Sequence, residues 1–593
     1  MKPFPAHSTS RRTFLRTSAS LVLGHALIPR QAIGAAAKMQ SRQADLILTG
    51  GRIVTVNRRF TICPAMAVQG NRILRVGTNE EVLSTRGAHT TIRELRGRMV
   101  LPGLIDSHVH PAAAMTEFDH AIPAMETIAD VLDYIRQRVG VLDPGRWIQV
   151  RQVFITRLRE QRYPTRAELD RVAPQHPVIF STGPDASLNS LALRLSGIDK
   201  NFLVADGGPG YVERDPVSGE PSGILRSCTR YVKVQSSEKQ PTESDFYDRT
   251  LALFKDYNSV GITGIGDRDA DDDAIARYWR MEQRGDLTLR VAISHHIDTL
   301  GPLADIQDRI RAVARDPLTG DNAFVRIIGI KTYLDGGMLT GSAYMREPWG
   351  LSQIYAIADP KYRGVLFIPR ERLVPIIQTA VESKLQFTAH TVGDGAVHAL
   401  LEAYEMVNQH RPIRRTRPCI SHSNFMSREA VAKLAPLGVC VDIQPAWLYL
   451  DTRTLLAQFG NDRLRYFQPL QSVFAAGGLA GGGSDHMQKI GSWRSINPYN
   501  PFLGMWITIT RQARGHEGAL HPEEALSREQ AIRFYTANNA YLLFQDRYAG
   551  SLEPGKRADF IELDTDLLNC SVDAIKSTRV LRTYLDGRLV FES

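Results

Sequence analysis

Eight short apolar runs, most of them separated by helical patterns, constrain the fold of this 593-residue chain more than any other feature. A strand buried in a parallel sheet is typically such a run, and strands that alternate with helices build parallel βα units. Eight units of this kind predict a closed (β/α)8 barrel of the TIM type. The expected strands are residues 100–106, 261–267, 289–295, 325–331, 386–390, 418–422, 439–445 and 479–485.

The two ends of the chain have a different pattern of apolar and polar residues from its middle. Residues 45–98 and 545–593 consist of short alternating patterns separated by turns, which predicts one small β-sandwich assembled from both ends. The barrel would then occupy residues 99–544. Because the stretch at about 112–250 is too long for one βα connection, we expect it to form an inserted subdomain over the barrel mouth. The predicted class is therefore α/β, a TIM-like barrel with a composite β-sandwich and an inserted α/β subdomain.

The first 37 residues resemble an export signal rather than part of a folded domain. The sequence SRRTFL at residues 10–15 precedes a weakly apolar stretch and a run of alanines at 35–37. This is the pattern of a twin-arginine signal peptide, and the apolar stretch is shorter than the roughly 20 residues that a spanning helix needs. We therefore expect residues 1–37 to direct export by the twin-arginine machinery and the mature protein to be periplasmic. No later segment is apolar enough to span a membrane.

Composition excludes two classes of protein. The formal net charge of +9 suggests an anionic partner, but five of the cations lie in the acid-free first 37 residues, and without them the charge is +4. No basic run with interleaved aromatic residues occurs, so we expect no nucleic-acid binding. The five cysteines are odd in number and form no CxxC pair, which favours neither a disulfide framework nor a cysteine metal site.

Six residues of metal-binding type stand where the predicted strands end. In a closed barrel these ends meet at one face, so the six side chains should converge. Each histidine alone could be an ordinary core residue, but together they predict a metal centre. Imidazole and carboxylate ligands favour zinc, with iron, manganese and nickel left open. The six residues are His108, His110, Lys331, His390, His422 and Asp485.

Beyond these residues, the chain resembles the amidohydrolase superfamily. The branch is amidohydrolase family 3, which includes N-substituted formamide deformylases and related exported hydrolases. The resemblance covers nearly all of residues 45–593. It rests on the motifs LPGLIDSHVH, GITGIGD, IKTYLDGG, HTVGDGAV, ISHSNF, GSDH, YTANNAYLLF and SLEPGKRADF, in that order along the chain.

The resemblance implies the role of each candidate ligand. It makes His108, His110, His390, His422 and Asp485 metal ligands and Lys331 a carboxylated lysine that bridges two ions. Addition of CO2 to the lysine amine forms a carbamate, which has two oxygen donors for divalent cations. One ion or two ions both remain open, and an ordinary cationic substrate clamp is the alternative for Lys331.

The reaction implied by the resemblance is metal-dependent hydrolysis of an amide or another non-peptide C–N bond of a small molecule. A metal-activated hydroxide would attack the substrate, with Asp485 as general base and His422 also contacting the substrate. The same residues would serve a lactone, ester or cyclic amide hydrolase. An exported binding protein that keeps the fold without turnover is an alternative of another class, and homodimerisation is left open.

Residues that surround the metal site would decide the substrate. We expect Tyr333, Trp447 and His486 to contact it, although each could equally be structural. The chain departs from the family pattern where Thr182-Gly183-Pro184 replaces a DGH-like segment and where Ser227 replaces an acid. Because these departures lie outside the inferred ligands, we expect a specificity that differs from that of the formamide hydrolases.

Overall fold

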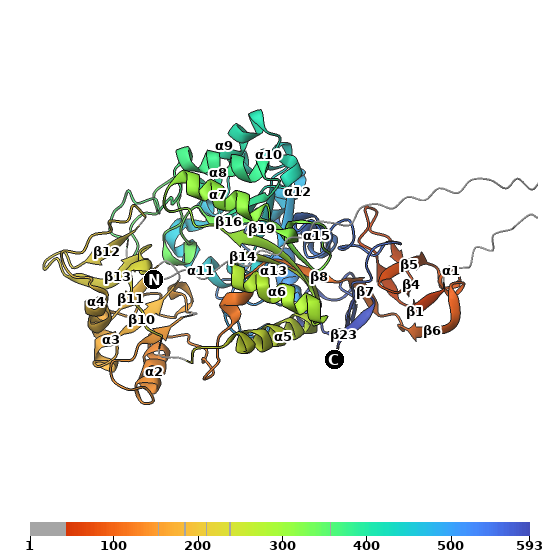
Figure 1. Cartoon of the computed structure of the whole chain (residues 1–593), viewed down its shortest axis with the longest axis horizontal. Helices are drawn as coiled ribbons and strands as arrows, with labels where there is room; N and C mark the ends of the chain where they lie inside the picture. Colours follow the sequence, from red (N-terminus) through yellow and green to blue (C-terminus); the bar gives the residue numbers. More distant parts are fainter. Residues whose placement is uncertain (1–42, 152, 183–184, 209, 237–238, 356) are drawn as a thin grey trace, which may run out of the picture. The chain divides into compact units, whose positions relative to one another are not determined.

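The computed structural model describes residues 43–151, 153–182, 185–208, 210–236, 239–355 and 357–593 (Figure 1). Arg42–Ser593 form one compact unit. The predicted signal peptide, residues 1–37, lies outside the described residues, so its assignment stays a prediction. Within the described ranges, no helix is both long enough and apolar enough to cross a bilayer.

An eight-stranded parallel sheet forms the centre of this unit (Figure 1). Its two edge strands meet through backbone hydrogen bonds. The N–H of His110 donates to the carbonyl of His486, and the N–H of Asp485 donates to the carbonyl of His108, both at 2.8 Å. The (β/α)8 class is thereby confirmed. The strands, in sheet order, are β20 (Leu479–Gly482), β19 (Cys440–Ile443), β18 (Cys419–His422), β17 (Gln386–Thr391), β16 (Val325–Tyr333), β15 (Arg290–His296), β14 (Ile262–Ala270) and β8 (Leu104–Val109).

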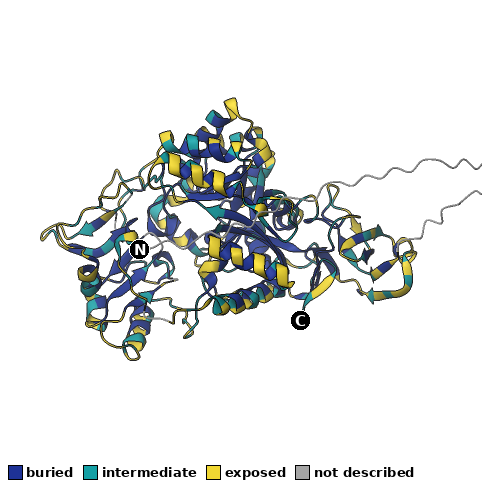
Figure 2. Cartoon of the chain, in the orientation of Figure 1, coloured by how far each residue is buried: buried dark blue, intermediate teal, exposed yellow. Residues whose placement is uncertain are grey.

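Helices follow the barrel strands and cover the sheet with their apolar faces. Local sequence sets their ends: the Asp271 side chain caps α6 by accepting from the N–H of Ala274, and Gly285 ends it at a φ of 74°. Figure 2 shows the result, with buried residues along the strands and exposed residues on the outer faces of the helices. These helices are α5 (Glu243–Ser259), α6 (Asp272–Arg284), α7 (Leu303–Val313), α8 (Arg370–Glu382), α9 (Asp394–His410), α10 (Arg428–Leu437), α11 (Pro445–Arg463), α12 (Leu470–Ala475), α13 (Pro501–Thr510), α14 (Arg528–Phe534) and α15 (Ala537–Leu542).

Both ends of the chain contribute to a separate β-structure, as the sequence predicts. A six-stranded sheet has the order β23-β22-β21-β7-β2-β3, and a four-stranded sheet, with the short helix α1 (Asn79–Leu83) packed against it, has the order β5-β4-β1-β6. A shared apolar core joins segments of both ends, for example Val68 and Phe560. The strands are β1 (Ala44–Thr49), β2 (Arg52–Val54), β3 (Ile62–Cys63), β4 (Ala65–Gln69), β5 (Arg72–Gly77), β6 (Arg86–Glu94), β7 (Met99–Pro102), β21 (Phe560–Leu563), β22 (Val580–Leu585) and β23 (Arg588–Glu592).

The predicted first barrel strand, residues 100–106, is wrong in its bounds. The run divides at Gly103, because Met99–Pro102 pairs with β21 of the composite sheet and Leu104–Val109 belongs to the barrel. A Cβ at Gly103 would lie 2.0 Å from the Thr263 side-chain oxygen, so only glycine fits at this junction. Continuous hydrophobicity carries no mark of a change of sheet, which is why the sequence pattern missed the break.

The long stretch between β8 and β14 contains an α/β subdomain, which we call the insert. Its five-stranded sheet has the order β12-β13-β11-β10-β9, in which β9 and β10 are parallel and the other pairs are antiparallel. The carboxyl ends of β9 and β10 therefore point the same way. Its elements are α2 (Ile128–Val139), β9 (Ile148–Val150), α3 (Arg166–Val172), β10 (Val178–Ser181), β11 (Ala186–Leu188), α4 (Ser190–Ser196), β12 (Tyr211–Arg214) and β13 (Pro221–Arg226).

Arg290 ties the barrel to the composite β-structure, and its removal should destabilise the chain. The guanidinium, 1% exposed, lies 2.7 Å from Asp559 and 2.6 Å from Asp586. Breaking a buried pair leaves an uncompensated charge, so we expect Arg290→Met to lose about 3–5 kcal/mol of unfolding free energy. Urea unfolding followed by far-UV circular dichroism measures this loss.

The matched control is Arg136→Met, which breaks the exposed pair with Asp133. Such a pair contributes about 1 kcal/mol or less. Similar shifts of the urea midpoint in both variants would contradict the structural role assigned to Arg290.

Candidate metal centre

The carboxyl ends of the barrel strands bring the six predicted ligands to one place. Five of them line a cavity of about 650 Å³: His110 after β8, Lys331 in β16, His390 in β17, His422 in β18 and Asp485 after β20. The sixth, His108 in β8, is fully buried beside them. The chain thus carries nitrogen and oxygen donors from five different segments to one end of the barrel, where sites of this fold lie.

Three of these side chains already have the spacing of ligands around one ion. The Nε2 atoms of His108 and His110 are 3.2 Å apart, and Asp485 Oδ1 lies 3.6 Å and 3.0 Å from them. Tetrahedral zinc with bonds of about 2.0–2.1 Å has ligand–ligand edges of roughly 3.3 Å. The donor set therefore fits a small divalent cation.

His390, His422 and Lys331 form the adjoining wall. The His422 ring centroid lies 4.5 Å from that of His390 and 4.7 Å from that of His108. Lys331 Nζ is fully buried and has no hydrogen-bond partner among the described residues. Burial lowers the pKa of Lys331, which favours the neutral amine. A buried amine without a hydrogen-bond partner costs free energy. Conversion of this amine to a carbamate would remove that cost, because the two carbamate oxygens could bind neighbouring cations.

Burial also keeps most of these imidazoles neutral. It lowers the pKa of His108 and of His422 well below the usual value, and it lowers that of His390 to about 3. Burial is the largest influence on His110 and acts in the same direction, but the hydrogen bond with Asp485 and the charges of Asp485 and Asp269 together outweigh it and raise the pKa. Neutral imidazole is the form that binds metal ions, so the environment prepares the ligands.

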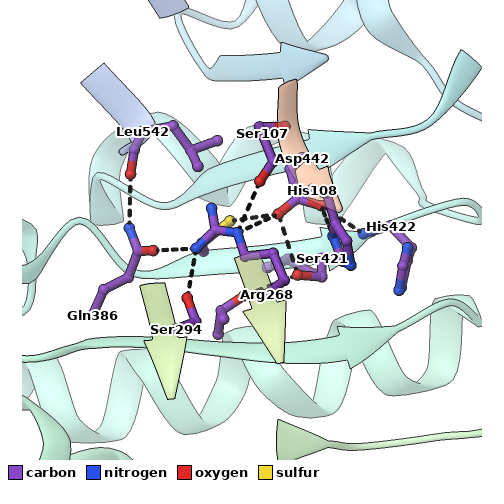
Figure 3. A network of polar contacts seen from close by, with 12 residues as sticks. Ser107, His108, Arg268, Ser294, Gln386, Ser421, His422, Asp442 and Leu542 are labelled. Atoms are coloured by element: carbon purple, nitrogen blue, oxygen red, sulfur yellow. Dashed lines mark hydrogen bonds and ion pairs between the residues drawn. The ribbon is translucent and has the colours of Figure 1, made fainter. Parts of the chain in front are cut away.

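Asp442, on β19, fixes the orientation of His108 (Figure 3). Its Oδ1 lies 2.9 Å from His108 Nδ1, and because a carboxylate only accepts, the imidazole donates from Nδ1 and keeps its Nε2 lone pair for a metal. Gln444 does the same for His422, whose Nδ1 lies 2.8 Å from Gln444 Oε1. Arg268 lies 3.5 Å from the other Asp442 oxygen and balances its charge.

Two acids beside the predicted ligands, Asp442 and Asp269, were not predicted from the sequence. Asp269, on β14, lines the cavity, and its two oxygens lie 2.7 Å from His296 Nδ1 and from the Tyr333 hydroxyl. A charged residue inside the apolar run VCVDIQP was the available signal for Asp442. Asp269 escaped because the predicted strand 261–267 ends three residues before β14 does.

The three predicted substrate contacts have different positions. Tyr333 lines the cavity, as expected. Trp447 does not, because it stacks behind His422 with ring centroids 4.9 Å apart. His486 is also outside the lining: its Nδ1 lies 2.6 Å from the Tyr257 hydroxyl and its Nε2 lies 2.9 Å from the Lys489 carbonyl oxygen. The structure therefore places neither Trp447 nor His486 in the cavity lining, and their predicted substrate contacts stay predictions.

Two of the departures from the family pattern, at residues 182–184 and at Ser227, lie in the insert, and a third, the absence of an arginine at Gly393-Asp394-Gly395, follows β17 of the barrel. Thr182 lines the cavity, whereas Gly183 and Pro184 lie outside the described residues. Ser227 is buried after β13, where its N–H donates to Asp185 Oδ1 at 2.7 Å. Thr182, one of the residues at which the chain departs from the family pattern, thus forms part of the cavity wall.

Comparison with known proteins identifies the family to which the chain belongs. Residues 91–591 match the model of the amidohydrolase family, so the chain belongs to the amidohydrolase family. It is 28% identical to the N-substituted formamide deformylase of Arthrobacter pascens, over 93% of this chain and 99% of that protein. It is 26% identical to the protein LONG AFTER FAR-RED 3 of Arabidopsis thaliana, over 92% of each chain.

A solved structure shows the same fold. The uncharacterized metal-dependent hydrolase from Pyrococcus horikoshii OT3 superimposes with a TM-score of 0.64 at 19% identity, over 89% of this chain and 99% of that one. Family membership supports a hydrolase with a metal centre, and the superposition supports the barrel.

Asp442→Asn should weaken metal binding in the folded protein, and it should also lower the stability of the barrel because it leaves the buried Arg268 without its ionic partner. Asparagine keeps the shape but loses the charge that holds His108 in its metal-binding tautomer. Loss of such a partner typically lowers metal affinity 10–100-fold, which competition with a chromophoric chelator measures.

Ser421→Ala is the matched control, since the Ser421 hydroxyl donates to the other Asp442 oxygen at 3.2 Å and leaves His108 untouched. Unchanged affinity in a folded Asp442→Asn variant would contradict the role of Asp442.

Proposed function

We propose that this protein is a metal-dependent hydrolase that cleaves an amide or another non-peptide C–N bond of a small molecule. The observation that carries the proposal is the convergence of His108, His110 and Asp485 beside the unpartnered amine of Lys331. The adjoining cavity of about 650 Å³ has room for a small substrate. Similarity to an N-substituted formamide deformylase over nearly the whole of both chains supports the C–N bond as the target.

The residues present fit one or two divalent ions, and we propose zinc. Such an ion, when bound, polarises a carbonyl and supplies hydroxide near neutral pH. His108, His110, His390 and His422 would hold the metal centre. Lys331, as a carbamate formed from its amine and CO2 with release of one proton, would contribute oxygen donors.

Asp485 and His422 are the residues that we assign to the reaction itself. The Asp485 carboxylate faces the cavity from the end of β20 and can accept a proton from water and return it to the leaving nitrogen. His422 donates from Nδ1 to Gln444, so the lone pair on its Nε2 is left for a metal ion or for a hydrogen-bond donor of the substrate. Both groups are held by buried partners, which keeps them in place during the reaction.

The test compares wild type, Asp485→Asn and Lys331→Ala, each produced with zinc and bicarbonate. We expect about two ions per wild-type chain and fewer in Lys331→Ala, as a bridged site requires. In Asp485→Asn we expect retained metal and at least a 100-fold loss of kcat, the usual contribution of a positioned general base. Elemental analysis and hydrolysis of formamides, cyclic amides, lactones and esters provide the two readouts.

Each outcome of this test has a distinct meaning. One ion in both wild type and Lys331→Ala would remove the bridging role of Lys331. Preference for lactones or esters would change the substrate class but keep the machinery. Metal binding without turnover on any class of compound would favour an exported binding protein.

We also propose that the protein works in the periplasm after export by the twin-arginine machinery. The support is the SRRTFL motif at residues 10–15. Replacing Arg11 and Arg12 with lysine should keep the protein in the cytoplasm of a bacterium that has this machinery. Immunoblots of periplasmic and cytoplasmic fractions measure the distribution.

A strain without the translocase is the control and should retain the wild-type protein inside the cell. Periplasmic recovery of the double lysine variant would reject the export route.

A further inference from the structure

Arg151, an exposed residue of the insert, adds a positive charge to the lining of the metal cavity. It follows the last residue of β9, and the end of the parallel neighbour β10 supplies Ser181 and Thr182 to the same wall. The cavity therefore has its metal-type residues on the barrel side and a guanidinium on the insert side. Nothing in the proposed reaction uses this second charge.

No carboxylate among the described residues forms an ion pair with Arg151. Its guanidinium donates to the side-chain oxygen of Gln149, which is neutral. Three other arginines of the insert are neutralised: Arg157, Arg162 and Arg226 pair with Asp451, Glu168 and Asp185 at 3.1, 2.7 and 3.2 Å. Arg151 differs from these three in both position and charge balance.

The acids of the cavity are all engaged elsewhere. Four aspartates line it, and each has hydrogen-bond or ionic partners on the barrel side. The partners are the Tyr278 hydroxyl for Asp267 (2.8 Å), His296 and Tyr333 for Asp269 (2.7 Å each), the N–H groups of Val392 and Gly393 for Asp335 (2.9 Å each) and His110 for Asp485 (3.0 Å). None of these four carboxylates forms an ion pair that neutralises the charge of Arg151.

The cavity that Arg151 lines suits an anion that also has an apolar part. Phe154, Leu339, Phe367 and Met487 line the same cavity. Walls of low polarity strengthen the field of a fixed charge. The planar fork of a guanidinium matches a carboxylate, which it can bind through two parallel hydrogen bonds.

We propose that the substrate carries a carboxylate and an apolar group in addition to the scissile bond, and that Arg151 binds the carboxylate. The scissile carbonyl would then lie on the side of the metal-type residues and the apolar group against the phenylalanines. This inference rests on the proposed function and adds a charged substrate class to it. The insert would thus select the substrate while the barrel performs the reaction.

The experiment compares two compounds that differ only in the carboxylate: N-formylphenylalanine, as both enantiomers, and N-(2-phenylethyl)formamide. Wild type, Arg151→Gln and Arg151→Lys are measured with zinc bound. Arg151→Gln should lower kcat/KM for the charged compound about 10–150-fold, the range for a hydrogen bond to a charged group, and leave the neutral compound within about twofold. Arg151→Lys keeps the charge without the fork and should give an intermediate value.

The matched control is Arg194→Gln, which removes one positive charge from an exposed position of the insert on α4, outside the cavity lining. It should change neither compound's kcat/KM. A similar loss for both compounds in Arg151→Gln would show a general structural effect and overturn the assignment. Far-UV circular dichroism confirms that each variant is folded.

A binding measurement separates this inference from the proposed function. Calorimetry with the zinc-loaded protein should show tighter binding of N-formylphenylalanine than of the neutral compound in wild type, and the difference should disappear in Arg151→Gln. Equal affinity of wild type and Arg151→Gln for the charged compound would overturn the inference, whether or not hydrolysis occurs. Binding that depends on Arg151, without hydrolysis of any amide, would instead contradict the proposed function alone.

Discussion

The buried pair of Arg268 and Asp442 connects the metal centre to the interior of the barrel (Figure 3). Arg268 also donates to Ser294 Oγ at 2.9 Å and to Gln386 Oε1 at 2.7 Å, so one guanidinium joins β14 to β15, β17 and β19. An isolated charge in this interior would be very costly, so each member of the pair requires the other. Because Asp442 in turn holds His108, the contacts among these barrel strands and the orientation of a metal ligand depend on the same carboxylate.

Much of the candidate site could be predicted from sequence because strand ends in a closed barrel converge. That rule placed Lys331 and His390 correctly without any knowledge of contacts. It could not find Asp442, whose role depends on a partner 334 residues away in the chain. Nor could it show that the first apolar run changes sheets at Gly103, since both halves are equally apolar.

His486 was predicted to contact the substrate although it directly follows Asp485. Successive side chains of an extended strand point to opposite faces, so alternation already directs His486 away from a cavity that Asp485 faces. The His486 ring lies between Tyr257 and the Lys489 carbonyl, outside the cavity lining. Asp485 itself has a φ of 54°, outside the strand region, so the backbone ceases to be regular where the site begins.

The two parts of the cavity wall are joined by contacts that leave the metal-type residues free. Arg226 of the insert pairs with Asp185 and donates to the Thr340 carbonyl at 3.0 Å, while Thr340 itself lines the cavity. At Arg226 the insert is therefore fixed against the barrel through a backbone group rather than through the ligands. Substitutions in the insert can accordingly alter the shape and charge presented to a substrate without disturbing His108 or Asp485. The departures from the family pattern at Thr182 and Ser227 lie in this part of the chain, where selectivity can change while the reaction is retained.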